Sequence, residues 1–353
     1  MKSTSQGVQS RNRSSRSLSI IGSLFLLFAT MVFSGCEEEV ESKAPPLNVP
    51  ADLSNPELMR SVAQQIIRDG LADAAPIVRS HAIELVVETK QARLIPAVQK
   101  LLADEFVPVR FAAVLAIADL DYEFGKASVE NMLRDPDPNV KLAASYAMAK
   151  FGMMQYAAVL RKAISSNDQT VRANASLLLG KLGNKEDLKL LYQALTDKSS
   201  EDKVAYQTAE SIARLKDERI YPKLWTMLIS AYADVRLMGV LSMAQLQTDE
   251  AKEALVGMLE DDVLEVRVAA AGKLGILGDN IGEPVVVETF EKGLLAGMDR
   301  RGHERAAMLV ASAIGQIGTP VLTNHLPELL QDESKLVRIA AAGAVLESIP
   351  GQN

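Results

Sequence analysis

The stretch ALVGMLEDDVLEVRVAAAGKLGILG (residues 254–278) decides the fold. On both sides of the acidic pair at 261–262, apolar residues recur three or four positions apart, which is the spacing of one face of an amphipathic helix. The acidic pair interrupts this spacing and indicates a turn. The stretch therefore predicts two short helices joined as a hairpin.

The same pattern recurs along the chain with a nearly fixed period. When the segments are aligned on the first residue of VR in this stretch, six of the eight intervals are 31 residues long, and the other two are 33 and 40 residues. The aligned residues are Val78, Val109, Val140, Val171, Val204, Val235, Val266, Ala306 and Val337. Because a single hairpin cannot bury its own apolar faces, repeats of this kind must stack on one another. The sequence predicts an all-α fold, an α-solenoid of about nine hairpins over residues 57–349.

Each aligned residue begins the second helix of its hairpin. The positions eight residues later are all apolar, and those four residues later are mostly alanine or glycine, so they form one buried face. Several repeats end in a glycine, which favours the left-handed conformation that stops a helix. These glycines are Gly152, Gly183, Gly278 and Gly318.

The pattern L..LL.D....VR..AA..AL..LG resembles the short HEAT-like repeat of phycobilisome-lyase-type proteins. Ankyrin and tetratricopeptide repeats have similar lengths, but their sequence signatures do not occur in this chain. The resemblance covers residues 57–349 and implies the fold. It implies a function only loosely, because such repeats serve as scaffolds, as adaptors and in a few enzymes.

The N-terminus has the composition of a secretory signal. Residues 1–17 are rich in Ser and Arg, residues 18–33 are apolar and uncharged, and Ser34-Gly35 precede Cys36, the only cysteine of the chain. The apolar run has 16 residues, which is short for a membrane span of about 20. We expect this segment, residues 1–35, to be cleaved.

The string FSGC (33–36) resembles the lipobox of bacterial lipoproteins, although Phe33 stands where leucine is usual. The resemblance implies a diacylglycerol thioether at Cys36 and acylation of the new amino group, which together form a durable membrane anchor. The alternative is an ordinary signal cleaved nearby, with an incidental free thiol. Glu37 follows the cysteine where a retention signal of the inner membrane would have Asp. We expect an exported lipoprotein, in the outer membrane and facing the periplasm if the cell has two membranes.

Residues 36–56 comprise the acylated cysteine and an acidic, proline-rich tether without helical periodicity, and residues 350–353 form a short tail. The whole chain carries a net charge of −7, and its four basic residues before Cys36 are lost on cleavage. Such an acidic protein is poorly suited to nucleic acid, whose binding depends on neutralising phosphates. The expected partners are proteins of the cell envelope and, through the lipid, the membrane.

No catalytic constellation is visible in the sequence. The chain has three histidines, His81, His303 and His325, and only His303-Glu304 matches the His-Glu pairs by which the HEAT-like deoxyhypusine hydroxylases hold iron, so that chemistry is rejected. Bilin chemistry of the lyase type lacks a distinctive group as well. We predict no enzyme activity and no cofactor other than the lipid, with a lyase-like or cofactor-handling HEAT-repeat enzyme as the alternative.

Two charged columns accompany the repeats. A basic residue follows most aligned positions, and an aspartate often precedes them by five residues. We predict that these charges form a ladder between stacked hairpins, and a stripe that binds an anionic ligand is the alternative. The residues are Arg79, Arg110, Lys141, Arg172, Arg236, Arg267 and Arg338, with Asp73, Asp104, Asp135, Asp261 and Asp332.

A third column is apolar and lies opposite the core face, two and six residues after the aligned positions. Second helices line the concave surface of HEAT-like solenoids, so these side chains would form a groove that docks a partner protein. Rotation of the helices, which would bury the same residues between repeats, is the alternative. The residues are Phe111, Leu115, Leu142, Tyr146, Leu177, Tyr206, Leu237 and Leu241.

The eighth repeat (279–318) contains nine extra residues, including GLLAGMDRRGHER. Such an insertion projects from one face of a solenoid, where it either binds a ligand or forms an irregular loop. Taken together, the features predict a membrane-anchored scaffold or adaptor that binds protein partners.

The lipid anchor gives the first testable prediction. Replacing Cys36 with Ser removes the acylated thiol, so we expect the protein to leave the membrane fraction while it keeps its circular dichroism spectrum and melting temperature. Fractionation of cells followed by immunoblotting measures this, and an unchanged membrane fraction would contradict lipidation.

Overall fold

The computed structural model describes residue 50 and residues 52–349. The predicted signal peptide, Cys36 and nearly all of the tether lie outside the described residues. No helix among those described is both long and apolar enough to cross a membrane.

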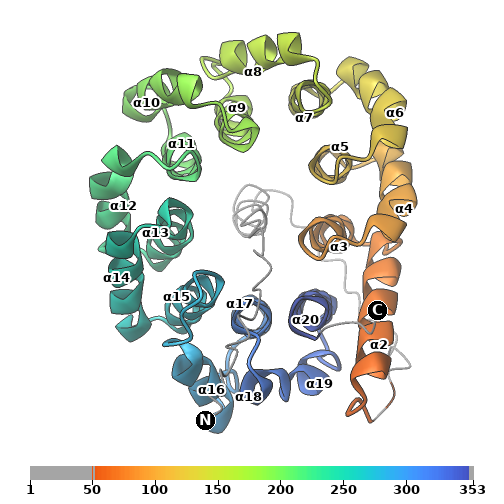
Figure 1. Cartoon of the computed structure of the whole chain (residues 1–353), viewed down its shortest axis with the longest axis vertical. Coiled ribbons are helices and arrows are strands. Elements are labelled where there is room, and N and C mark those ends of the chain that lie inside the picture. Colours follow the sequence, from red (N-terminus) through yellow and green to blue (C-terminus); the bar gives the residue numbers. More distant parts are fainter. Residues whose placement is uncertain (1–49, 51, 350–353) are drawn as a thin grey trace, which may run out of the picture.

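The described residues form nine helical hairpins, as the 31-residue period predicts, and contain no β-strand. The first helix of each hairpin lies on the outside and the second on the inside (Figure 1). The outer helices are α2 (Pro56–Leu71), α4 (Ile95–Lys100), α6 (Lys126–Asn131), α8 (Ala157–Ala163), α10 (Leu188–Thr196), α12 (Tyr221–Leu228), α14 (Asp249–Gly257), α16 (Glu283–Glu291), and the pair α18 (Pro320–Thr323) and α19 (Leu326–Leu329). The inner helices are α3 (Pro76–Glu88), α5 (Val107–Asp119), α7 (Pro138–Lys150), α9 (Gln169–Leu182), α11 (Asp202–Arg214), α13 (Ala233–Leu246), α15 (Leu264–Ile276), α17 (Arg300–Ile317) and α20 (Lys335–Ser348).

The solenoid closes on itself into a ring (Figure 1). Helix α20 of the last repeat packs against both α2 and α3 of the first. Two glycines allow this close approach: a Cβ atom at Gly70 would lie 2.9 Å from Cδ1 of Ile339, and one at Gly343 would lie 2.7 Å from Cδ2 of Leu85. We call this contact between the first and last repeats the seam.

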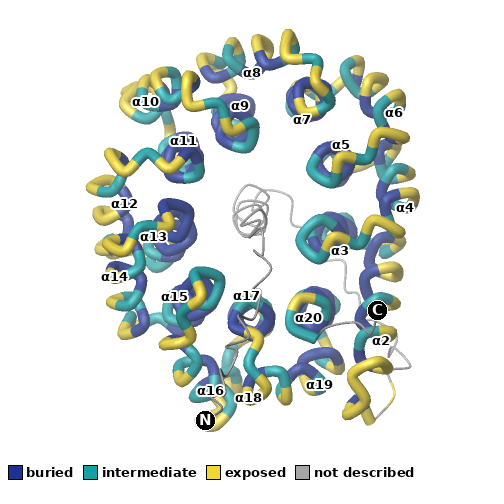
Figure 2. The backbone as a smooth tube through the Cα atoms, viewed as in Figure 1, coloured by how far each residue is buried: buried dark blue, intermediate teal, exposed yellow. Residues whose placement is uncertain are grey.

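The core follows the wall of the ring. Nearly all of the aligned residues, and all of the apolar residues eight positions later, are buried. Figure 2 shows buried residues concentrated on the inner helices and exposed residues on the outer ones. Burial of apolar side chains at about 25 cal/mol per Å² stabilises each junction between neighbouring repeats.

The predicted ladder of arginine and aspartate joins neighbouring repeats at several junctions, whereas Arg267 and Arg338 donate to carbonyl oxygens of their own turns. Arg79 Nε lies 2.8 Å from Asp104 Oδ2, and Arg110 Nε lies 2.8 Å from Asp135 Oδ2. Arg236 makes the same contact with Asp261, and all six side chains are largely buried. Each guanidinium also donates to a carbonyl oxygen of its own turn. Because these paired charges are bidentate and hydrogen-bonded, they set the register between repeats.

The ladder continues across the seam. Lys335 Nζ of the last repeat lies 2.8 Å from Oδ2 of Asp73, the ladder aspartate of the first repeat. Arg60 of α2 donates a hydrogen bond to the carbonyl oxygen of Ile349 at the end of the chain's last hairpin. The first and last repeats therefore meet through polar contacts as well as apolar ones.

At every junction between described repeats, one residue in the left-handed conformation follows the inner helix. It lies twelve positions after the aligned residue. The four predicted glycines have φ between 70° and 89°. The other four junctions use residues other than glycine, with φ between 50° and 60°. These residues are Lys90, Asp121, Lys216 and Gln247. A positive φ at this point turns the chain back to the outer wall, so it is a requirement of the repeat.

Paired glycine substitutions test this requirement. Gly183 has φ +79°, so Gly183→Ala should lower the free energy of unfolding by about 1 kcal/mol because alanine strains at positive φ. Gly257 ends helix α14 in open space, so Gly257→Ala should leave stability unchanged or raise it by up to about 1 kcal/mol. Urea unfolding measures both, and equal effects of the two substitutions would contradict the account.

Candidate functional site

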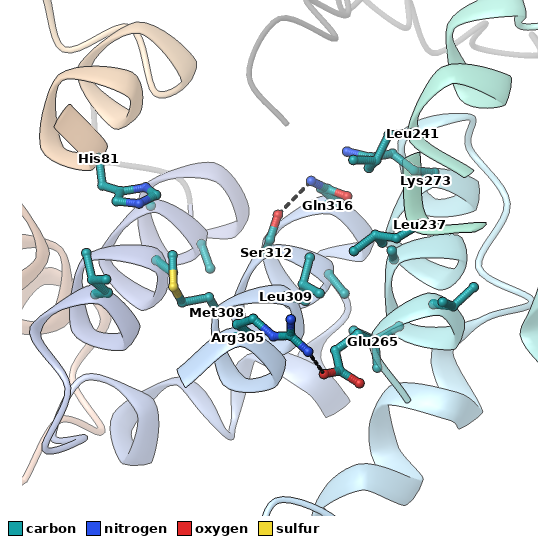
Figure 3. A pocket seen from close by; sticks show the side chains of 18 of the residues that line it. His81, Leu237, Leu241, Glu265, Lys273, Arg305, Met308, Leu309, Ser312 and Gln316 are labelled. Atoms are coloured by element: carbon teal, nitrogen blue, oxygen red, sulfur yellow. Dashed lines mark hydrogen bonds and ion pairs between the residues drawn. The ribbon is translucent and has the colours of Figure 1, made fainter. Parts of the chain in front are cut away.

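A cavity of about 120 Å³ lies inside the ring, on the side where the seam is. Inner helices from five repeats line it, namely α3, α13, α15, α17 and α20. Its walls are mainly apolar and include Leu237, Leu241, Met308 and Leu309 (Figure 3). Ile339 lines it as well. Because α3 comes from the first repeat and α20 from the last, the cavity is assembled only when the ring closes.

Charged groups gather at one end of this cavity, where the inner helices end. Glu88 of α3, Lys273 of α15 and Glu347 at the end of α20 all line it and interact electrostatically. Enclosure within the ring raises the pKa of Glu88 and of Glu347, and the neighbouring carboxylates raise that of Glu88 further. Burial lowers the pKa of Lys273 to about 8, although both glutamates oppose this shift. The Lys273 residue is only 3% exposed.

His81 lines the same cavity and is 2% exposed. Neither of its ring nitrogens makes a hydrogen bond in the described structure. Its Nδ1 atom lies 3.5 Å from Oε2 of Glu84, and that oxygen is buried without a hydrogen bond too. Figure 3 shows the imidazole reaching from α3 on the side opposite Lys273. Polar atoms that are buried without partners cost free energy, so they mark a place where a ligand would be stabilised.

Ion pairs at another part of the cavity wall connect three inner helices. Arg305 of α17 lies 3.3 Å from Glu265 of α15 and 3.8 Å from Asp234 of α13. Arg305 is about half exposed, so water weakens these pairs. Deeper in, Gln316 donates to Ser312 on the same helix (Figure 3).

A second polar cluster joins inner helices on the other side of the ring. Asp119 of α5 accepts a hydrogen bond from the hydroxyl of Tyr146 on α7 and forms a 2.8 Å ion pair with Lys181 of α9. Burial and the adjacent carboxylate raise the pKa of Tyr146 well above its usual value. One carboxylate therefore links three successive repeats.

The predicted partner-binding column lies on the inner helices, as expected, but most of it is buried. Each inner helix is flanked by the inner helices of both neighbours, so little of its surface remains free. Tyr206 is half-buried, and the other seven residues are buried: Phe111, Leu115, Leu142, Tyr146, Leu177, Leu237 and Leu241. Leu237 and Leu241 line the cavity. Their role in binding a partner stays a prediction.

The polar groups inside the ring were not predicted from the sequence, although a column of the repeat contains them. Ten residues after the aligned positions the chain places Glu88, Asp119, Lys150, Lys181, Arg214, Gln245, Ile276, Gln316 and Glu347. Consecutive acidic residues lie on α20, α3 and α5, and consecutive basic residues lie on α7, α9 and α11. This grouping becomes visible only when the first and last repeats are treated as neighbours.

The extra residues of the eighth repeat form a loop between α16 and a longer α17. His303 lies in the first turn of α17, and its Nε2 atom lies 2.9 Å from Oδ2 of Asp332. This hydrogen bond raises the pKa of His303. Since this repeat lacks the ladder arginine, His303 takes its place at the junction with the ninth repeat.

No group of three or more His, Cys, Asp or Glu side chains is arranged to hold a metal ion between residues 52 and 349.

Comparisons with known proteins bear on the repeats. Residues 126–213 match the family model of HEAT repeats. This part of the chain has the sequence pattern of HEAT repeats. No curated protein sequence matches it.

Solved HEAT-like structures resemble the chain at low identity. Human deoxyhypusine hydroxylase is 18% identical, with 74% of this chain and 97% of that chain covered and a TM-score of 0.37. The complex of CpcE and CpcF of phycocyanin lyase from Nostoc is 20% identical, with coverage of 78% and 96% and a TM-score of 0.31. Importin beta is 15% identical, with coverage of 78% and 46% and a TM-score of 0.32.

The raised pKa of Glu88 predicts a pH dependence of stability. A carboxyl whose pKa is raised by folding stabilises the fold fully below its ordinary pKa and loses that contribution as pH rises through the raised value. Between pH 5 and pH 8 we expect the wild type to lose on the order of 1–2 kcal/mol more than Glu88→Gln.

Urea unfolding at several pH values measures this difference. Glu291→Gln is the control, because Glu291 is exposed at the end of α16, and it should follow the wild type. A Glu88→Gln profile parallel to the wild type would contradict the account.

Proposed function

We propose that the protein is a membrane-anchored scaffold of the cell envelope that binds a partner protein through the outer wall of its ring. The anchor is Cys36, on the sequence evidence given above. The HEAT-repeat solenoid supplies a stable frame, and the surface of that frame supplies the binding site.

An exposed aromatic surface on α12 and the turn after it carries this proposal. Trp225, the only tryptophan of the chain, is 45% exposed and stacks on Tyr221 with ring centroids 6.4 Å apart. Ile229 and Tyr232 follow and are 65% and 74% exposed. We call these four residues the α12 surface. Tryptophan and tyrosine dominate the binding energy of protein interfaces, and large apolar residues gathered on a surface mark such sites.

The closed ring explains why binding would move to this wall. In an open solenoid the inner helices offer a concave groove, whereas here seven of the eight residues of the predicted groove are buried. A folded partner therefore meets the outer helices first. The α12 surface lies on the outside of the ring, away from the seam (Figure 1).

The cavity inside the ring, which we call the lumen cavity, supports a second function: binding of a small molecule. Charged side chains from three repeats, the buried Lys273 with Glu88 and Glu347, converge there on an apolar space. This arrangement supports binding of a small molecule, as in the cofactor-handling alternative. It does not by itself supply a catalytic mechanism.

Site-specific cross-linking tests the scaffold function. A photoreactive phenylalanine at position 225 in intact cells should capture an envelope protein, which mass spectrometry identifies. Purified partner should then shift the emission of Trp225 in the wild type to shorter wavelength as the indole is buried, and the titration yields a Kd.

Substitutions on the α12 surface should weaken this binding. With a labelled partner as the probe, we expect Trp225→Ala and Ile229→Ser to raise the Kd at least about tenfold, because each removes apolar contact area at the centre of the surface. Phe124→Ala is the matched control, since Phe124 is an apolar residue that is 87% exposed at a different junction. If the α12 variants bind as tightly as the control variant, the proposed surface is wrong.

A further inference from the structure

We propose that the lumen cavity is a binding site for a small organic ammonium ion, one that carries an apolar group of about six carbon atoms. The apolar group would lie among Leu237, Met308 and Ile339, and the ammonium would lie against the face of α3 that carries His81, Glu84 and Glu88. No part of this inference depends on the α12 surface.

The size and the lining of the cavity set the apolar part of the ligand. A cavity of about 120 Å³ is close to the engineered cavity of about 150 Å³ that binds benzene. Leucine, valine, methionine and isoleucine side chains from all five helices form the apolar part of its wall. A chain or ring of about six carbon atoms fits such a space.

The balance of charge sets the sign of the ligand. At the charged end, α3 contributes Glu84 beside the cavity and Glu88 within it, and α20 contributes Glu347. Lys273 of α15 is the basic side chain whose charge acts on Glu88 and Glu347. Three carboxyl groups face one ammonium group, so acidic groups are in excess; a second ammonium group would reduce this excess, and an added carboxylate would increase it.

The unpartnered imidazole of His81 is an independent indication of a ligand. A neutral imidazole nitrogen accepts a hydrogen bond, and an organic ammonium group offers up to three donors. His81 and Glu84 both have buried acceptor atoms without a hydrogen-bond donor. An ammonium between them would satisfy atoms that otherwise cost free energy.

The remaining charged groups of the cavity do not compete for this ligand. Asp234 of α13 and Glu265 of α15 are both paired with Arg305 of α17. Gln316 of α17 adds a neutral amide, and its position is fixed by the hydrogen bond to Ser312. Gly315 leaves room for the carboxylate of Glu347, because a Cβ atom at that position would lie 2.5 Å from Glu347 Oε2.

Binding is linked to protonation. The pKa of Glu88 is raised to about 8 and that of Glu347 to about 7, so these carboxyl groups are partly protonated near neutral pH in the free protein. An arriving ammonium stabilises the ionised carboxylates, so these protons are released. Raising the pH from 6 to 8 should therefore strengthen binding, whereas an apolar ligand without charge should show no such trend.

Isothermal titration calorimetry on the folded protein tests the inference with hexylammonium chloride as the probe. Hexan-1-ol and sodium hexanoate are matched in length and differ in charge. We expect hexylammonium to bind at least about tenfold more tightly than either, with proton release seen as a heat that depends on the ionisation enthalpy of the buffer.

Equal binding of the alcohol would show a merely apolar cavity, and tighter binding of hexanoate would show an anion site at Lys273. Either result overturns the inference, as does an absence of binding by all three compounds. This comparison uses the wild type and does not depend on the stability of any variant.

Variants then locate the site. Glu88→Gln and Glu347→Gln should each weaken hexylammonium binding about tenfold and reduce the proton release, while Glu291→Gln should bind as the wild type does. Trp225→Ala should also bind normally, so failure of the α12 surface and failure of the lumen site are distinguishable. Unchanged binding in both glutamine variants would place the ligand elsewhere and overturn the assignment.

Discussion

The arginine–aspartate contact between neighbouring repeats is the interaction on which the rest of the structure depends. At three junctions an arginine at the start of one inner helix binds the aspartate 25 residues later, at nearly the same distance each time. A constant contact imposes a constant step from each repeat to the next. Together with apolar packing at the other junctions, these steps bring the last repeat to the first, where Lys335 and Asp73 make a further ion pair. The ring closes because a similar rotation between neighbouring repeats accumulates along the chain. The cavity inside it forms only when the ring closes.

The sequence predicts the local features well because each depends on residues close together in the chain. The period of 31 residues predicts the hairpins, and the glycines at 152, 183, 278 and 318 predict where inner helices stop. The ladder follows from charges that recur with the repeat. Each of these signals is repeated several times, so one irregular repeat, such as the eighth, does not hide it.

Closure could not be predicted in the same way. It depends on small rotations between repeats, which accumulate over the whole chain, and on contacts such as that of Gly343 with Leu85 between opposite ends of the sequence. The expectation of an exposed groove assumed an open superhelix. In the ring, neighbouring inner helices cover Phe111 and Leu142, and a carboxylate holds Tyr146. The cluster of Glu88, Lys273 and Glu347 combines residues from the first, seventh and ninth repeats, which no local pattern connects.

The most direct test of the closed ring is the distance across the seam. Nitroxide labels at Asp69→Cys and Glu333→Cys, in a chain with Cys36→Ser, lie on exposed residues of the first and last repeats. Double electron–electron resonance should show one narrow distribution of short distances, because Lys335 and Asp73 are in contact beside these positions. A broad distribution at long distances would show an open solenoid and would contradict both the ring and the cavity that depends on it.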